Sequence, residues 1–201
     1  MITRSEGFSQ AIEDAVAQVE ERTDAEVVVV LAERSGSYRD LAMVAATALS
    51  LALLVALFFA PWTFHPVGIS LEIAAFWAIA TWALDRTSLP RLLAGARRQR
   101  AQVRAAARAE FVAELVHATP HRTGVLVYVS ALEREVLLLP DLGVEGRVPA
   151  GLWADLVPRF HHADLPAFQS ALAAMGGVLA AHIPKLEVDE VDLPNAPRVR
   201  K

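Results

Sequence analysis

Residues Leu41–Ala60 read LAMVAATALSLALLVALFFA, and this run decides the architecture of the 201-residue chain. It has twenty residues and contains no charged residue, no glycine and no proline. At a rise of about 1.5 Å per residue, a helix of this length covers the ~30 Å hydrocarbon core of a bilayer. A buried helix of a soluble protein is usually shorter and carries some polar stripe. We therefore predict a transmembrane helix over residues 41–60.

A second apolar run follows a short connection around Pro61–Pro66. Its continuous part, Ile73–Leu84, is short for a span, but counting from Val67 gives eighteen residues. Glu72 then lies near one end of the run, where a carboxylate can reach interfacial water. Three tryptophans are expected as interfacial anchors: Trp62, Trp77 and Trp82. The two runs together predict a hairpin of antiparallel transmembrane helices, 41–60 and 67–84, within residues 41–84.

Arginines set the expected orientation of this hairpin. Seven of them lie between Arg86 and Arg108 with no acidic residue among them, whereas the connection between the spans has no Lys or Arg. Because cytoplasmic segments carry the excess of positive charge, we expect a multi-pass membrane protein with the soluble domain and both termini in the cytoplasm. Residues 85–108 are predicted to form a basic juxtamembrane helix. Five arginines are expected to bind anionic lipid headgroups: Arg86, Arg91, Arg97, Arg98 and Arg100.

A nucleic-acid partner is not expected for these arginines. They adjoin a span, and no aromatic residues are interleaved among them to stack on bases. The lipid bilayer is therefore the expected partner of this stretch, together with a second membrane protein for the chain as a whole.

Sequence patterns on both sides of the hairpin predict helices and strands. Before it, Ser5–Arg22 has helical spacing, and Glu26–Ala32 (EVVVVLA) is a strand that is apolar on both faces. After it, Gly124–Val129 and Glu135–Leu139 are strands whose five-residue link favours an antiparallel hairpin. The expected later helices span about Pro90–His117, about Ala150–Phe160, and the amphipathic run marked by Phe168, Leu172, Met175, Leu179 and Ile183. In this last helix, Gly176-Gly177 is expected to allow close packing on the sheet.

These elements predict one α/β domain that the membrane hairpin interrupts. One helix and one strand cannot bury a strand that is apolar on both faces, so its neighbours must come from beyond the hairpin. We expect a sheet of at least three strands with helices on both faces, built from residues 1–40 and residues 109–184. Residues 185–201 are charged and contain proline, so they are predicted to be a disordered tail.

Short motifs in both parts resemble the TPM domain family. The segments Arg122–Ser130 (RTGVLVYVS), Leu132–Val136 (LEREV) and Asp141–Val144 (DLGV), followed by Trp153, are similar to the second half of that domain. Val19–Val29 (VEERTDAEVVV) looks like its first helix and strand, and Leu179–Pro184 like its closing helix. The resemblance covers most of residues 8–184 apart from the spans. It implies a TPM-like α/β/α sandwich, as in thylakoid-lumen and photosystem-repair proteins, and a membrane-embedded bacterial branch with an inserted hairpin.

The resemblance also implies a metal site and a phosphatase label, because some family members are described as acid phosphatases or as calcium-binding. Soluble members place acidic residues in the loop that is Pro140–Gly146 here, which makes Asp141 and Glu145 the matching ligands. A divalent cation such as calcium or magnesium takes several oxygen ligands. An acidic residue of the family pattern is missing near Ala150, where this chain reads Val-Pro-Ala. The alternative interpretation is that Asp141 stabilises a turn with Gly143.

Other polar residues give weaker signals. Asp24 and Glu26 flank the first strand and could reach the same sheet edge as Asp141, against the alternative of a turn residue and a solvated strand start. His117 and His121 are four residues apart, but Pro120 breaks the helix between them, so they are not expected to bind a metal together. The His161-His162-Asp164 group is interpreted as surface residues. Ser130 follows a strand, but the sequence places no base beside it. The chain has no cysteine and no HExxH, GxxxxGK or GxSxG motif.

Two functions from different classes stay open. The first is an accessory or binding protein at the membrane, favoured by the missing acidic residue and by the absence of a strong catalytic motif. The second is a metal-assisted phosphatase at the cytoplasmic membrane face, with Asp141 and Glu145 as ligands. An enzyme of this kind needs at least three converging oxygen ligands, whereas a binding module needs an exposed recognition surface.

Overall fold

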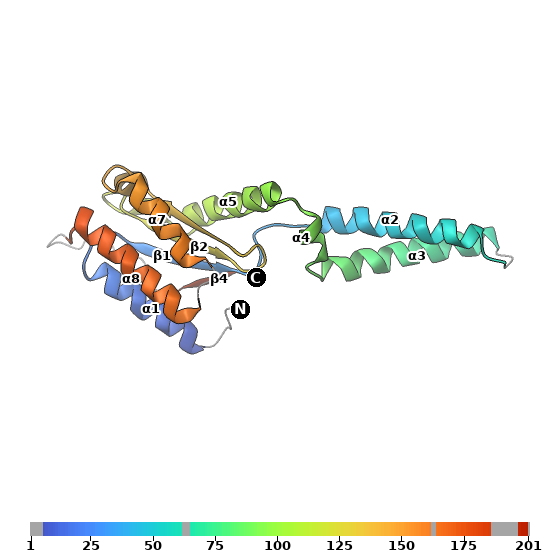
Figure 1. Cartoon of the computed structure of the whole chain (residues 1–201), viewed down its shortest axis with the longest axis horizontal. Helices are drawn as coiled ribbons and strands as arrows, with labels where there is room; N and C mark the ends of the chain where they lie inside the picture. The colour runs from blue at the N-terminus through green and yellow to red at the C-terminus, as the bar shows by residue number, and fades with distance from the viewer. Residues whose placement is uncertain (1–5, 62–64, 162–163, 186–196, 201) are drawn as a thin grey trace. The chain divides into compact units, whose positions relative to one another are not determined.

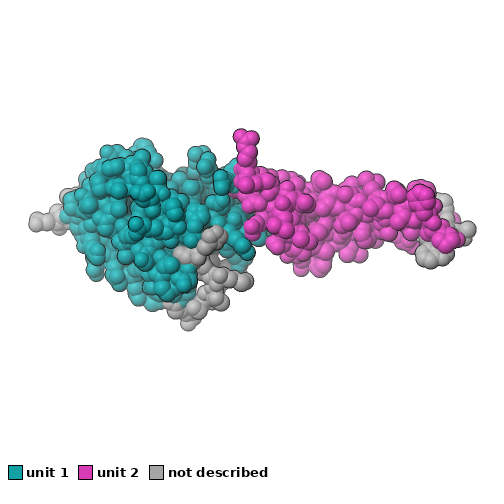
Figure 2. Space-filling view, in the orientation of Figure 1, with its two compact units in different colours: residues 1–35, 100–201 teal, residues 36–99 magenta. Residues whose placement is uncertain are grey.

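The computed structural model describes residues 6–61, 65–161, 164–185 and 197–200. Trp62, His162 and residues 186–196 of the predicted tail lie outside this range. The described chain forms two compact units, residues 36–99 and the two flanking segments 1–35 and 100–201 (Figure 2).

The helices and strands are shown in Figure 1. In chain order they are α1 (Glu6–Glu20), β1 (Val27–Ala32), α2 (Arg39–Phe58), α3 (Pro66–Asp85), α4 (Leu89–Leu93), α5 (Ala96–Ala113), β2 (Val125–Ser130), β3 (Glu135–Pro140), α6 (Leu142–Glu145), α7 (Ala150–Phe160), α8 (Leu165–His182) and β4 (Arg198–Arg200).

The sheet of the flanking-segment unit has the strand order β3-β2-β1-β4. β1 lies parallel to β2, with Val27 opposite Val125, and β2 lies antiparallel to β3. The predicted mixed α/β class and the predicted β2–β3 hairpin are therefore confirmed. β1 comes before the apolar hairpin in the sequence and β2 after it, so one sheet joins both parts of the chain.

Helices cover both faces of this sheet. Because successive side chains of a strand point to opposite faces, β1 contributes to two core clusters. Val27 and Val29 pack in a cluster with residues of α1, α7 and α8, whereas Val28 and Val30 pack in a second cluster with residues of α5. All four valines are at most 2% exposed. The prediction that this strand is covered on both faces is confirmed.

One close helix contact differs from the prediction made for Gly176-Gly177. A Cβ atom on Gly176 would lie 2.8 Å from Val19 Cγ2 of α1, whereas a Cβ atom on Gly177 would meet nothing within 4 Å. Gly176 therefore lets α8 approach α1, not the sheet, and Gly177 plays no part in this close contact.

The unit of residues 36–99 holds the apolar hairpin. Two of its helices are long and apolar enough to cross a membrane, Arg39–Phe58 with a mean hydropathy of 2.5 and Val67–Asp85 with 1.7. They pack side by side, and Trp77 Nε1 donates a hydrogen bond to Thr47 Oγ1 at 3.0 Å. The helices agree with the predicted runs 41–60 and 67–84 to within about two residues, as helix ends are normally defined.

The predicted basic helix, residues 85–108, is broken in the structure. α4 ends at Leu93, Ala94 has an extended backbone, and α5 begins at Ala96. Gly95 has poor helix propensity, and the Gln99 side chain donates hydrogen bonds to the carbonyls of Arg91 and Ala94 at 2.9 Å, so carbonyls at the end of α4 are satisfied without continuation of the helix. The interruption of the helix was not predicted.

Two further segments differ from the sequence prediction. Residues 198–200 were assigned to a disordered tail, but they form the edge strand β4, paired in parallel with Val30–Ala32. The predicted turn after β3 contains a one-turn helix, α6. In both places the structure depends on contacts with residues far away in the sequence, which local composition does not show.

Candidate functional site

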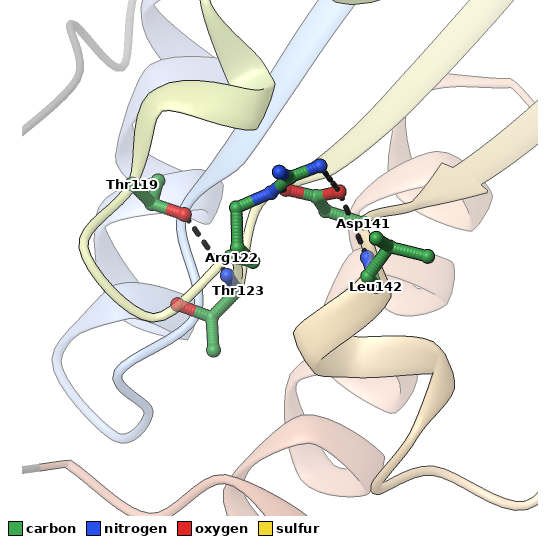
Figure 3. Close-up of polar contacts among 5 residues, drawn as sticks. All are labelled: Thr119, Arg122, Thr123, Asp141 and Leu142. Carbon is green, nitrogen blue, oxygen red and sulfur yellow. Dashed lines mark hydrogen bonds and ion pairs between the residues drawn. The ribbon is translucent and has the colours of Figure 1, made fainter.

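Asp141 lies at the end of β3 and begins α6. Its side chain is 3% exposed and accepts a hydrogen bond from the Leu142 N–H at 2.8 Å. The guanidinium of Arg122 holds both carboxylate oxygens, with Nε at 2.6 Å from Oδ2 and Nη2 at 2.8 Å from Oδ1 (Figure 3). Burial acts to raise the pKa of Asp141, but Arg122 and the Leu142 N–H outweigh it and hold this pKa below its usual value. The carboxylate is therefore an ionised structural partner of Arg122.

The backbone around Arg122 is shaped to make this pair. Arg122 adopts the left-handed conformation, with φ of 56°, which is uncommon for a residue with a side chain. Its carbonyl accepts a hydrogen bond from the Gly143 N–H at 2.9 Å. A Cβ atom on Gly143 would lie 2.2 Å from the His121 carbonyl oxygen, so only glycine fits there. The turn before β2 and the start of α6 are thus held in direct contact.

Glu145, the second predicted ligand, is exposed on α6. It borders an open cavity of about 360 Å³ lined otherwise by apolar side chains and Trp153, and Ala150 borders the same cavity. Across the described residues, no group of three or more His, Cys, Asp or Glu side chains is placed to hold a metal ion. Three hydrogen bonds already occupy the two Asp141 oxygens, so a cation there would compete with Arg122. The predicted metal site at Asp141 and Glu145 therefore stays a prediction. The alternative interpretation, in which Asp141 stabilises a turn, agrees with its observed position as the N-cap of α6.

A second polar cluster lies where the parallel strands β1 and β2 end. Ser130, the last residue of β2, donates a short hydrogen bond to Glu133, and Ser35 Oγ donates to Ser130 Oγ at 2.6 Å. The Ser35 N–H donates to Glu133 Oε2 at 3.1 Å, and Ser35 Oγ lies 3.0 Å from the Tyr128 hydroxyl. Burial raises the pKa of Tyr128, which keeps its hydroxyl neutral. Sequence reasoning missed this cluster.

The Ser130–Glu133 pair has the atoms of a nucleophile and a base, but it is closed to solvent. Ser130 is 1% exposed and Glu133 is 4% exposed. Their bonds join the segment that follows β1 to the turn between β2 and β3, so the cluster fixes the point at which the chain leaves the sheet for the hairpin. In the sequence, the one signal for this cluster is that Ser130, the last residue of β2, and Glu133, in the β2–β3 turn, lie three residues apart.

The remaining predicted polar residues have structural contacts. Asp164 caps α8, since its side chain accepts from the Ala167 N–H at 2.9 Å. The carbonyl of Asp24 accepts from Thr123 Oγ1 at 2.8 Å, and that of Glu26 accepts from the Val125 N–H at 2.7 Å. His161 Nε2 lies 3.6 Å from Glu135, and the His117 ring stacks on Phe111. The structure does not bring these residues together into one site.

The arginines expected at lipid headgroups differ in their contacts. Arg98 donates from two nitrogens to both oxygens of Asp40, each at 2.8 Å, so its guanidinium already has a carboxylate partner. Arg86 lies over the Trp82 ring at 4.1 Å, and Arg100 lies 3.3 Å from Glu135 while 66% exposed. Arg97 is exposed on α5, whereas Arg91 on α4 is only partly exposed.

Comparison with known proteins identifies a shared fold but assigns no activity. No family model matches the chain, and no curated protein sequence matches it. Among solved structures, the chain is similar to the NMR structure of the BA42 protein from the psychrophilic bacterium Bizionia argentinensis sp. nov., with a TM-score of 0.58 and 15% sequence identity. The match covers 97% of this chain and 94% of that one. At this identity the likeness shows that the two chains share a fold and nothing more.

Proposed function

We propose that this protein is a membrane-anchored binding protein, in which a TPM-like α/β domain is held at the cytoplasmic face of the inner membrane by the hairpin α2–α3. The observation that carries the proposal is the lack of protein cover on the two apolar helices. In their most apolar windows, only 17% of the residues of the first helix and none of the second are buried. The core helix of a soluble protein would be mostly buried, so a lipid environment is the natural solvent for these helices.

The TPM-like sandwich is supported by where the resembling segments lie. Arg122–Ser130 contains β2, Leu132–Val136 covers most of the β2–β3 turn and the start of β3, and Asp141–Val144 lies at the start of α6. Each segment therefore lies on or beside the sheet, which helices cover on both faces. Assignment to the TPM family is part of this proposal.

The arginines support the cytoplasmic orientation and contact with anionic lipid. We propose that Arg86, Arg91 and Arg97 meet headgroups at roughly 1 kcal/mol each near the membrane surface. Arg98 and Arg100 contribute less, since each already has a carboxylate partner, Asp40 and Glu135.

A binding role is favoured over catalysis by the state of Asp141. Both of its oxygens are held by Arg122 and the Leu142 N–H, and a metal-assisted phosphatase needs several free oxygen ligands. The phosphatase remains the alternative, and in it a cation would compete with Arg122 for the Asp141 carboxylate.

The anchoring role is tested by topology reporters. We expect a reporter that is active only in the periplasm to give a signal when inserted at Pro61 and none when fused before residue 6. We also expect the full chain to stay in the membrane fraction during alkaline extraction. A periplasmic signal from the N-terminal fusion, or release of the chain by alkali, would contradict the proposal.

The binding role is tested against the phosphatase in the same preparation. The purified full chain is assayed for hydrolysis of p-nitrophenyl phosphate with calcium or magnesium across pH, with Asp141→Asn as the matched control. We expect no hydrolysis above that of the variant. Hydrolysis that depends on both the metal and Asp141 would replace the binding role with the phosphatase.

A further inference from the structure

The outer edge of β1, on the side away from β2, is paired with a short strand from the C-terminal part of the same chain. Arg198–Arg200, at the end of the chain, pairs in parallel with Val30–Ala32 as β4. β4 has three residues, whereas β1, β2 and β3 have six each. β4 is thus a short addition to a sheet that β1, β2 and β3 already form.

A carboxylate recognises the first residue of β4. Arg198 Nε lies 2.8 Å from Glu114 Oε2, with the two side chains 22% and 13% exposed. Arg198 is opposite Val30 in the register, so its side chain points to the face that α5 covers, and Glu114 directly follows α5. The edge therefore offers both backbone hydrogen-bonding groups and one partly buried negative charge.

At the other end of β1, the domain itself takes up one backbone donor of this edge. The Val27 N–H donates to Glu20 Oε1 at 2.9 Å. Among the described residues, β4 is the strand that pairs with this edge, beside Val30–Ala32. An apolar strand whose edge lacks a partner there would readily accept an extended segment, which is the basis of strand addition.

We propose that the edge of β1 at Val30–Ala32, together with Glu114, is a docking site for an extended basic segment of a partner protein. The segment it fits has an arginine opposite Val30 and continues as a strand parallel to β1. β4 occupies the site within the chain, and the partner segment displaces it. This inference names the partner for the binding role proposed above and rests on that role.

The covalent attachment of β4 sets how strongly it competes. A tethered segment is present at an effective concentration of roughly millimolar, so a free segment meets strong competition in the intact chain. Removal of β4 should therefore strengthen binding of a free segment by about tenfold or more.

The test uses a labelled peptide of residues 196–201, APRVRK, and the full chain in lipid nanodiscs. Binding is measured by fluorescence anisotropy to the intact chain and to a chain that ends at Pro197. We expect binding to the shortened chain and at least about tenfold weaker binding to the intact one. The peptide with Arg200→Pro lacks the N–H that the parallel register places toward the Leu31 carbonyl, so it should not bind. The peptide with Arg198→Glu should not bind either.

A charge exchange separates the proposed site from general attraction to a basic peptide. In the shortened chain, Glu114→Lys should abolish binding of APRVRK and restore binding of the Arg198→Glu peptide, while the exposed Glu21→Lys should change neither. If the shortened chain does not fold, the full-length Arg198→Glu variant is used instead, because it disfavours β4 without a deletion and should bind APRVRK more tightly than the intact chain does.

Two outcomes would overturn the docking site. One is a folded, membrane-inserted shortened chain, or Arg198→Glu chain, that does not bind APRVRK; the other is binding that Glu114→Lys and Glu21→Lys weaken equally. Either result leaves membrane anchoring intact, whereas failure of the topology experiment overturns the proposed function itself.

Discussion

Among single residues, Arg122 controls the charge of the buried carboxyl group of Asp141. Asp141 is 3% exposed, and burial alone would raise its pKa, but the Arg122 guanidinium reverses the direction. A carboxylate with a lowered pKa in the folded state stabilises the fold above its ordinary value of 3.8. That contribution is lost as the pH falls through the lower pKa of the folded state.

Replacement of Arg122 by methionine should therefore move acid unfolding to higher pH. Without the cation, burial acts on Asp141 with less opposition, so the carboxyl group takes up a proton earlier. At pH 7 we expect the free energy of unfolding to fall only modestly, because the guanidinium is half exposed and solvent screens the ion pair. Circular dichroism across pH measures both effects. The exposed Arg147→Met is the control, and an unchanged acid midpoint in Arg122→Met would contradict the expectation.

Sequence reasoning reached only part of this residue chemistry. The turn role of Asp141 follows from an aspartate two residues before a glycine. Its partner Arg122 does not follow, because the pair depends on a left-handed backbone at Arg122 and on the contact of Gly143 with His121. The buried contact of Ser35 with Ser130 and Glu133 was missed for a similar reason, since the hairpin separates these residues in the sequence.

At the scale of helices and strands, the elements with strong hydrophobic periodicity were predicted, whereas the short strand β4 and the break between α4 and α5 were not. β1, β2, β3 and the two apolar helices have strong periodicity or long apolar runs, which reflect burial directly. β4 has the sequence Arg-Val-Arg, and it is a strand only because the edge of β1 accepts it. The break at Gly95 depends on the side chain of Gln99, which local propensity does not include.

The contact between α1 and α8 gives a prediction with an internal control. Gly176→Ala should lower the free energy of unfolding by about 1–3 kcal/mol, because the new methyl group would overlap Val19 on α1. Gly177→Ala should instead raise it by up to about 1 kcal/mol, since alanine favours the helix and meets open space. Denaturant unfolding of both variants measures the difference. Equal effects at the two positions would show that α8 does not approach α1 through Gly176.

At the scale of the whole molecule, both core clusters lie outside the hairpin. Their buried residues come from residues 8–32 and 103–183 only. The domain therefore does not need residues 36–99 for its core, although these residues link its two parts in the sequence.

We expect residues 36–99 to be replaceable by a flexible Gly/Ser linker of about 15 residues, with a reach of roughly 20 Å. The cost of closing a loop changes slowly with its length, by about 0.6 kcal/mol per doubling, so the sheet should still form. The variant should be soluble and should unfold in one cooperative transition followed by circular dichroism. Aggregation of this variant, or a molten state that lacks cooperative unfolding, would show that the hairpin is required for the domain to fold.

The order of the strands along the chain has a consequence for biosynthesis. β1 leaves the ribosome early, but its neighbour β2 begins only at Val125, after both apolar helices have been made. At ~5–20 residues per second, the apolar strand waits on the order of ten seconds for a partner. Translation therefore completes both apolar helices before the sheet can close, and during this interval the apolar nascent segment Val27–Ala32 is a natural client of ribosome-associated chaperones.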